Sequence, residues 1–256
     1  MLSNKKYIIL ILIILVFFVI MFLLFGVDNI KKENYSTAIV IGDDSVFVLE
    51  KQEWFNITSD YEDLNWDKFN VYSNNEKIGN YYLWHNDKWY VFDNKKNPVN
   101  IEGTILGISS NYNINVYEFN EENIDNSKYI DEILENNNFP KDTTLTTKYK
   151  ISFDFDRDGV IEEFYLVSNV FNLDENPEKV FSLVFMVKND EVYPIYTDIK
   201  NNESLDGCKP YITSFLNIDE DDTSEFILSC GKYSVEKTTH MLYKFKDNKF
   251  KILVSN

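Results

Sequence analysis

The sequence is poor in glycine, histidine and basic residues. Its 8 Gly and 2 His among 256 residues are too few for glycine-rich phosphate loops or histidine-rich metal clusters. Its 25 Lys and Arg are outnumbered by 42 Asp and Glu, and the net charge of −17 would repel nucleic acid over most of the surface. A hydrophobic share of 44% still suffices for a packed core, which argues against a mostly disordered chain.

Common catalytic motifs are also missing. The chain contains neither G-x-S-x-G nor H-E-x-x-H, and His85 and His240 stand alone. Paired carboxylates could serve a glycosidase, but loose acids occur everywhere in so acidic a chain. The sequence therefore predicts no enzyme and no catalytic residue.

A long apolar run stands near the beginning of the chain. It begins at Tyr7, ends at Phe25 and holds no charge, Gly or Pro; as a helix it would be about 28 Å long, close to the hydrocarbon thickness of a bilayer. The following residues FGVDNIKKE contain no A-x-A-like cleavage site and no Cys for lipid attachment, so we expect an uncleaved anchor.

Orientation follows from the charges beside this run. Two lysines flank it on each side, but the α-amino charge adds to the N-terminal side and favours an N-terminus inside the cell. We therefore expect a single-pass protein of a bacterial cell membrane with an extracytoplasmic C-terminal domain. The richness in Asn, Lys, Ile and Asp resembles that of AT-rich bacterial genomes.

Beyond residue 33, short apolar and aromatic runs such as SVFVLE and KWYVFD alternate with Asn/Asp turns and predict β-strands. Asn and Asp tolerate positive φ best among the non-glycine residues, so such pairs predict hairpin tips. The pairs are Asn86-Asp87, Asp93-Asn94, Asn189-Asp190 and Asp247-Asn248. In one exception, Ile130, Ile133 and Leu134 recur at helical spacing before Pro140. We expect an all-β fold with one transmembrane helix and one short connecting helix.

This pattern divides the chain into four expected parts. They are a cytoplasmic tail, anchor and tether (residues 1–33), a β-meander subdomain (34–120), a connecting helix (121–144) and a pair of β-repeats (145–256).

The sharpest motif is an acidic loop of the form D-x-D-x-D-G-x-x-E between the strand-like KYKISF and EFYLVSN. Its carboxylates would converge and repel one another unless a hard cation neutralised them, and calcium suits such oxygen ligands. Gly159 lets the loop wrap around the ion, and Val160 can offer its backbone carbonyl. The predicted calcium ligands are Asp154, Asp156, Asp158, Val160 and Glu162.

A second loop repeats this spacing 63 residues later, between YITSFL and FILSCG. Asn217 replaces the first Asp and Asp222 replaces the loop glycine, so we expect weaker metal binding here. The corresponding ligands are Asn217, Asp219, Asp221, Thr223 and Glu225.

The two loops together resemble a known family. The first is no EF-hand, because Tyr165 stands where an EF-hand has its last Glu and the flanks are strands. Ligands at positions one, three, five, seven and nine of a hairpin loop resemble the calcium loops of FG-GAP or VCBS-like repeats of integrin-type β-propellers. The resemblance covers about residues 148–250 and departs at Arg157, where that family often has Gly.

This resemblance implies blade-like repeats with a structural Ca²⁺ ion and a structural or recognition role toward an unknown surface ligand or protein. The roughly 220 residues beyond residue 33 are too few for a closed propeller of six or seven blades, and closure into a propeller-like ring stays open. Two alternatives are kept: an envelope protein that binds or processes carbohydrate, and a metal-free scaffold.

Two further features allow two interpretations each. Cys208 and Cys230 flank the second acidic loop out of simple antiparallel register, so they form either a disulfide across a bulge or two buried thiols. Six aromatic residues between positions 81 and 92 surround one Asn-Asp turn and could stack on sugars. Core packing is the favoured interpretation of these residues, and of Trp54 and Trp66.

Overall fold

In the computed structural model the chain divides into residues 1–34 and 35–256, and the second unit holds all the residues that the structure describes. These are residues 37–42, 45–57, 64–110, 114–124, 127–170, 179–201, 207–219, 221–232 and 238–256. No helix within these ranges is long and apolar enough to cross a membrane. The predicted anchor from Tyr7 to Phe25 lies outside them.

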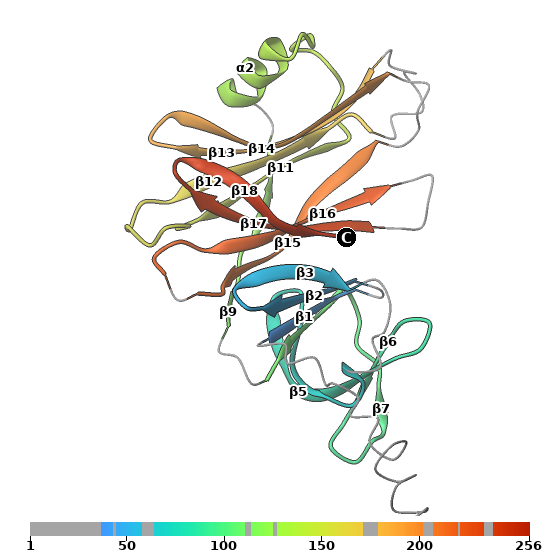
Figure 1. The fold of residues 1–256 in the computed structure, drawn as a ribbon. Helices are drawn as coiled ribbons and strands as arrows, with labels where there is room; N and C mark the ends of the chain where they lie inside the picture. Colours follow the sequence, from blue (N-terminus) through green and yellow to red (C-terminus); the bar gives the residue numbers. More distant parts are fainter. Residues whose placement is uncertain are drawn as a thin grey trace, which may run out of the picture. The chain divides into compact units, whose positions relative to one another are not determined.

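The described part of the chain is mostly β, with 18 strands in three antiparallel sheets and one helix (Figure 1). The expected β-rich fold and the short helix are therefore confirmed. The helix, α2 (Lys128–Asn136), begins after Ser127 and buries Ile130 and Leu134.

The N-terminal sheet has eight strands in the order β3-β2-β1-β8-β4-β5-β6-β7. Since β8 lies between β1 and β4, this sheet is not a simple meander. Its strands are β1 (Thr37–Ile41), β2 (Ser45–Glu50), β3 (Glu53–Ile57), β4 (Lys68–Ser73), β5 (Glu76–His85), β6 (Trp89–Phe92), β7 (Pro98–Val99) and β8 (Ile105–Ser109).

The other two sheets are each built on four consecutive strands. The first meander sheet consists of β11 (Thr147–Phe153), β12 (Glu162–Ser168), β13 (Lys179–Lys188) and β14 (Glu191–Asn201). The second meander sheet consists of β15 (Cys208–Asn217), β16 (Glu225–Lys232), β17 (Thr238–Lys246) and β18 (Lys249–Ser255). Each gains a fifth strand at its first edge, β10 (Glu121–Asn123) beside β11 and β9 (Asn115–Tyr117) beside β15.

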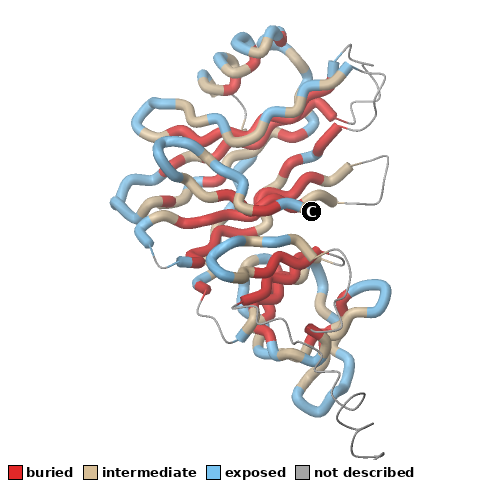
Figure 2. Tube along the Cα trace, in the orientation of Figure 1, coloured by how far each residue is buried: buried red, intermediate tan, exposed pale blue. Residues whose placement is uncertain are grey.

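Apolar clusters join these elements into layers. Phe164 of the first meander sheet packs with Phe215 and Phe226 of the second. The second sheet also contributes Leu216, Ile227 and Leu242 to a cluster with residues of β1 and β2, while α2 packs against the opposite side of the first sheet. The inner strands β13 and β16 are accordingly buried over most of their length, whereas the edge strands β14 and β18 are largely exposed or half-buried (Figure 2). The two acidic loops are connections within these packed meanders.

All four predicted hairpin turns are confirmed, but the positive φ expected at their tips is present in only two of them. Asn189-Asp190 and Asp247-Asn248 have positive φ and join β13 to β14 and β17 to β18. Neither Asn86-Asp87 nor Asp93-Asn94 has it. The Asp93 carboxylate instead accepts hydrogen bonds from the backbone N–H groups of Lys95 and Asn97, which stabilises a wider turn.

The two cysteines form a disulfide, with their Cα atoms 5.2 Å apart. Cys230 lies opposite Pro210 rather than Cys208, and the register of β15 shifts between Ile212 and Ser214. The irregularity that antiparallel counting required is therefore present.

Core packing is confirmed for Trp89, which is 3% exposed, and wrong for Trp66, which is 40% exposed. Trp84 is half-buried and, within the described residues, belongs to none of the hydrophobic clusters. Alternation along β5 explains this, because it is Leu83 that points into the core.

Candidate cation-binding loops

The first acidic loop connects β11 to β12 and is fixed by its second and last residues. Phe155 is buried among the aromatic side chains between the two meander sheets. Its backbone N–H donates a hydrogen bond of 2.7 Å to Oε2 of Glu162, whose side chain is fully buried at the start of β12. A buried carboxylate thus satisfies a buried backbone donor, and the loop closes around this bond.

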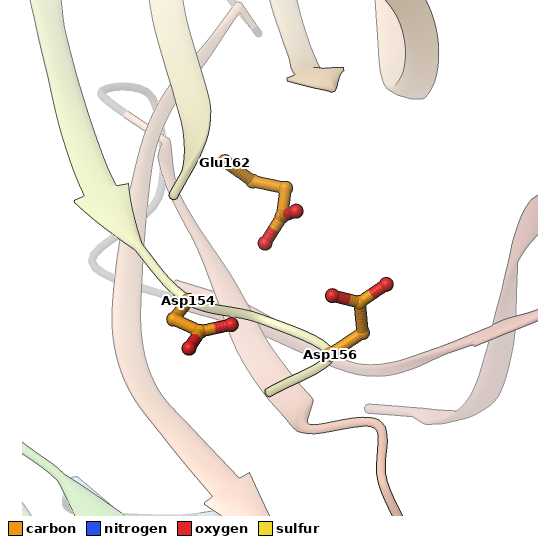
Figure 3. Close-up of side chains that lie close together, drawn as sticks. All are labelled: Asp154, Asp156 and Glu162. Carbon is orange, nitrogen blue, oxygen red and sulfur yellow. The ribbon is translucent and has the colours of Figure 1, made fainter. Parts of the chain in front are cut away.

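Three carboxyl groups of this loop face a common space (Figure 3). One oxygen each from Asp154, Asp156 and Glu162 lies within 4.8 Å of the others. Calcium binds oxygen at 2.3–2.6 Å, so two oxygens on one ion can be at most about 5 Å apart. The three oxygens therefore meet this distance limit for a shared calcium ion.

The other two predicted ligands lie on the outer part of the loop. The exposed Asp158 accepts a 2.8 Å hydrogen bond from the backbone N–H of Val160, whose side chain is also exposed. Gly159 has a φ of 85° and Arg157 a φ of 57°, so this turn uses left-handed backbone twice. The Arg157 side chain donates a 2.5 Å hydrogen bond to the hydroxyl of Tyr117 on β9.

The same space also receives an ammonium group that the sequence analysis did not predict. Lys188, the last residue of β13, forms ion pairs with Asp156, with Asp158 at 2.9 Å and with Oε1 of Glu162 at 3.2 Å. Its position follows from the register, because Val187 pairs with Glu163 and the next pair along would be Lys188 with Glu162. One positive charge thus neutralises part of the cluster.

The second acidic loop connects β15 to β16 with the same bonds. The backbone N–H of Ile218 donates a 2.9 Å hydrogen bond to Oε2 of Glu225, whose side chain is 1% exposed. The N–H of Thr223 donates a 2.8 Å hydrogen bond to Asp221. Ile218 packs into the cluster between the second meander sheet and the N-terminal sheet, as Phe155 does in the neighbouring cluster. Every one of these bonds has its counterpart 63 residues earlier.

The second loop also has its own lysine. Lys244 on β17 lies opposite Glu225 and forms ion pairs with Asp219, with Asp221 at 2.7 Å and with Oε1 of Glu225 at 3.1 Å. One oxygen each from Asp219, Asp221 and Glu225 again lies within 4.8 Å of the others. Asn217, the remaining predicted ligand, is buried at the end of β15.

Burial and the lysines act in opposite directions on the carboxyl groups. Burial raises the pKa of Glu162 above its ordinary value and raises the pKa of Glu225 to about 7. The hydrogen bond from Lys188 lowers the pKa of Asp158. The innermost carboxylate of each loop is therefore the one whose negative charge is least favoured without a cation.

The loops differ in one predicted ligand. Each lysine pairs with three carboxylates, but the first loop has a further carboxylate, Asp154, where the second has the neutral Asn217. Buried oxygens on Asp154 and Asp156 accept no hydrogen bond, and among the described residues no carboxyl oxygen of the second loop is in that state. The donor set of the first loop therefore fits a divalent cation better.

No acidic-loop spacing could have revealed the two lysines. Lys188 lies 26 residues after Glu162 and Lys244 only 19 residues after Glu225, because the connections between the strands differ in length. Only the strand register places both opposite the buried glutamates.

The chain matches no family model, no curated protein and no solved structure. The resemblance to FG-GAP repeats therefore rests on the two loops and their flanking strands alone.

Proposed function

We propose that this protein is a membrane-anchored extracytoplasmic β-repeat module of a bacterial surface, whose first acidic loop binds a structural calcium ion. Its role is structural support or recognition of a surface ligand, without catalysis. The two meander sheets would act as blade-like repeats of the FG-GAP type, each with its loop between the first and second strand of the meander.

The observation that carries this proposal is the duplicated loop. Two hairpin connections, 63 residues apart, bury a glutamate that accepts the backbone N–H of an apolar residue, and both gather carboxylates beside it. A solvated acidic turn would not need a buried carboxylate. The same arrangement in two meanders supports a repeat built around a cation site.

Calcium at the first loop would be held by Asp154, Asp156 and Glu162, with Asp158 and the carbonyl of Val160 completing the set. The ion would contact one buried oxygen each of Asp154 and Asp156 that accepts no hydrogen bond. Lys188 lies against the same carboxylates, so calcium and the ammonium group would compete for them. The second loop has the neutral Asn217 in place of Asp154, and we propose that metal binding there is weak.

The disulfide supports an extracytoplasmic location. Disulfides persist mainly in oxidising compartments, and Cys208 and Cys230 are paired on neighbouring strands. An anchor from Tyr7 to Phe25 would hold the β-rich part outside the membrane, where calcium is plentiful.

The second candidate is a metal-free scaffold, and the two lysines favour it. Each loop already contains a cation supplied by the chain, in the same position relative to its buried glutamate. In this alternative, Lys188 and Lys244 would replace the metal in both loops.

Calcium titration separates the two candidates. We expect the full chain in detergent, stripped with chelator, to gain about 1.4 kcal/mol at calcium ten-fold above its dissociation constant, which raises Tm by roughly 3–6 °C. Asp154→Asn and Asp156→Asn should abolish the shift, whereas the matched variant Asp219→Asn in the second loop should keep it. A wild-type Tm that does not move at millimolar calcium would leave the metal-free scaffold as the function.

A further inference from the structure

The β5–β6 hairpin presents a row of aromatic rings on the side opposite the core. Leu83, Trp89 and Val91 point into the N-terminal sheet's cluster, so their neighbours along the strands point the other way. Tyr82 pairs across the hairpin with Phe92, and Trp84 pairs with Tyr90. Together with Trp66 they form what we call the aromatic face. Its members are Trp66, Tyr82, Trp84, Tyr90 and Phe92.

The rings of this face contact one another. The ring of Trp66 lies 5.0 Å from that of Phe92 and 6.5 Å from that of Trp84, which in turn lies 5.9 Å from Tyr90. Trp66 is 40% exposed, although its φ of 66° is unusual for a bulky residue. A large apolar ring is thus kept at the surface in a conformation that costs free energy.

The aromatic face takes no part in the hydrophobic clusters. Within the described residues, none of its five members belongs to a cluster or packs against one. Trp66 is exposed and the other four are half-buried, and a contiguous apolar patch at a soluble surface typically marks an interaction site. The face therefore needs a partner rather than a place in the core.

Lysines surround the aromatic face. The ammonium group of Lys96 lies 4.8 Å from the ring centre of Trp66, and that of Lys88 lies 5.6 Å from the ring centre of Tyr90. Lys68 on β4 is the register partner of Tyr82 on β5. Residues 64–99 contain five Lys against four Asp and Glu, so they carry a formal charge of +1 in a chain whose net charge is −17. This is a local exception to a strongly acidic molecule.

The N-terminal sheet follows the expected membrane anchor after only a short segment of chain. The apolar run ends at Phe25 and β1 begins at Thr37, and the residues between can span at most about 40 Å. Trp and Tyr are enriched at the level of lipid headgroups, and lysines beside a membrane bind anionic lipids. The aromatic residues, the lysines and the short tether therefore all favour an anionic lipid bilayer as the partner.

We propose that the aromatic face binds the headgroup region of an anionic lipid bilayer, with Trp66 and Trp84 at the interface and Lys68, Lys88 and Lys96 against lipid phosphates. This inference rests on the proposed membrane anchor. It adds a second membrane contact that would hold the N-terminal sheet against the lipid.

Tryptophan quenching tests this contact in the full chain. The protein is reconstituted into vesicles of phosphatidylcholine and phosphatidylglycerol, with brominated lipid as quencher, after flotation has shown that it is bound. We expect quenching in the wild type, loss of most of it in Trp66→Phe/Trp84→Phe, and little change in the matched variant Trp54→Phe, whose half-buried ring packs against a different cluster. Lys88→Glu/Lys96→Glu should also reduce it.

Each other outcome overturns the inference in a recognisable way. A chain that floats with the vesicles but shows no quenching has the anchor without the lipid contact. A chain that does not float has neither, and the proposed anchor fails as well. If cell-wall glycan fragments shift the fluorescence of Trp66 and Trp84 while lipid does not, the partner is a carbohydrate.

Discussion

The two acidic loops share their bonds and differ in their charge. Both bury a glutamate on the N–H of an apolar residue and both hold a lysine against it. The first has Asp154 and Gly159 where the second has Asn217 and Asp222, and Asp222 lacks the positive φ of Gly159. The hairpin geometry therefore does not depend on the full set of predicted calcium ligands, whereas the number of carboxylates available to a cation does.

This comparison separates the loop's framework from its ligands. Phe155 and Ile218 fill neighbouring cores, and each pins its loop to a glutamate at the start of the next strand. The carboxylates around them can then vary without loss of the fold. A repeat can lose metal affinity while it retains its hairpin, as we propose for the second loop.

The largest effect is expected from removal of the buried glutamates. Glu162→Ala leaves the N–H of Phe155 without an acceptor and removes a partner of Lys188, so we expect a loss of about 3 kcal/mol in the free energy of unfolding. Glu225→Ala should cost a similar amount in urea denaturation with chelator present. The exposed Glu132→Ala on α2 is the control. A loss in only one loop would break the comparison, because the shared framework would then be absent from the other.

The disulfide should have an effect of similar size, and it belongs to the second meander sheet alone. The bond closes a separation of 22 residues that contains the second loop, and chain entropy predicts a loss of about 3 kcal/mol for Cys208→Ser/Cys230→Ser. Urea denaturation of this variant measures it. The calcium response of the first loop should not change. If it disappears, the disulfide is coupled to the first loop through the cluster that both cysteines share with Phe155.

The sequence predicted those features of the fold that depend on local patterns. Asn189-Asp190 forms its tight turn because positive φ is a property of the two residues themselves, and α2 follows from the spacing of Ile130 and Leu134. Asp93-Asn94 also forms a hairpin turn but without positive φ, because the Asp93 side chain stabilises a wider turn by hydrogen bonds. The insertion of β8 between β1 and β4 is set by pairing over long distances, which no local pattern records.

The sequence predicted the carboxylates of the candidate site but not its lysines. The acidic spacing identified the carboxylates that gather at both loops, because they lie in one short segment. Lys188 and Lys244 come from another strand and could be recognised only through its register. Trp66 was expected in the core, but its left-handed backbone and its exposed position are properties of the folded chain.

The smallest and most discriminating effect is expected from the lysines themselves. Lys188→Met removes a positive charge next to the calcium ligands and keeps a side chain of similar length, so we expect roughly tenfold tighter calcium binding, or about 1.4 kcal/mol. Without calcium the same variant should be less stable, because its four carboxylates then repel one another. Lys244→Met should give the second loop a measurable but weaker calcium response, since Asn217 contributes no charge. Calorimetric titration of both variants against the wild type checks this order. If Lys188→Met binds calcium more weakly than the wild type, the lysine supports the ion rather than competing with it, and the difference between the loops lies in their ligands alone.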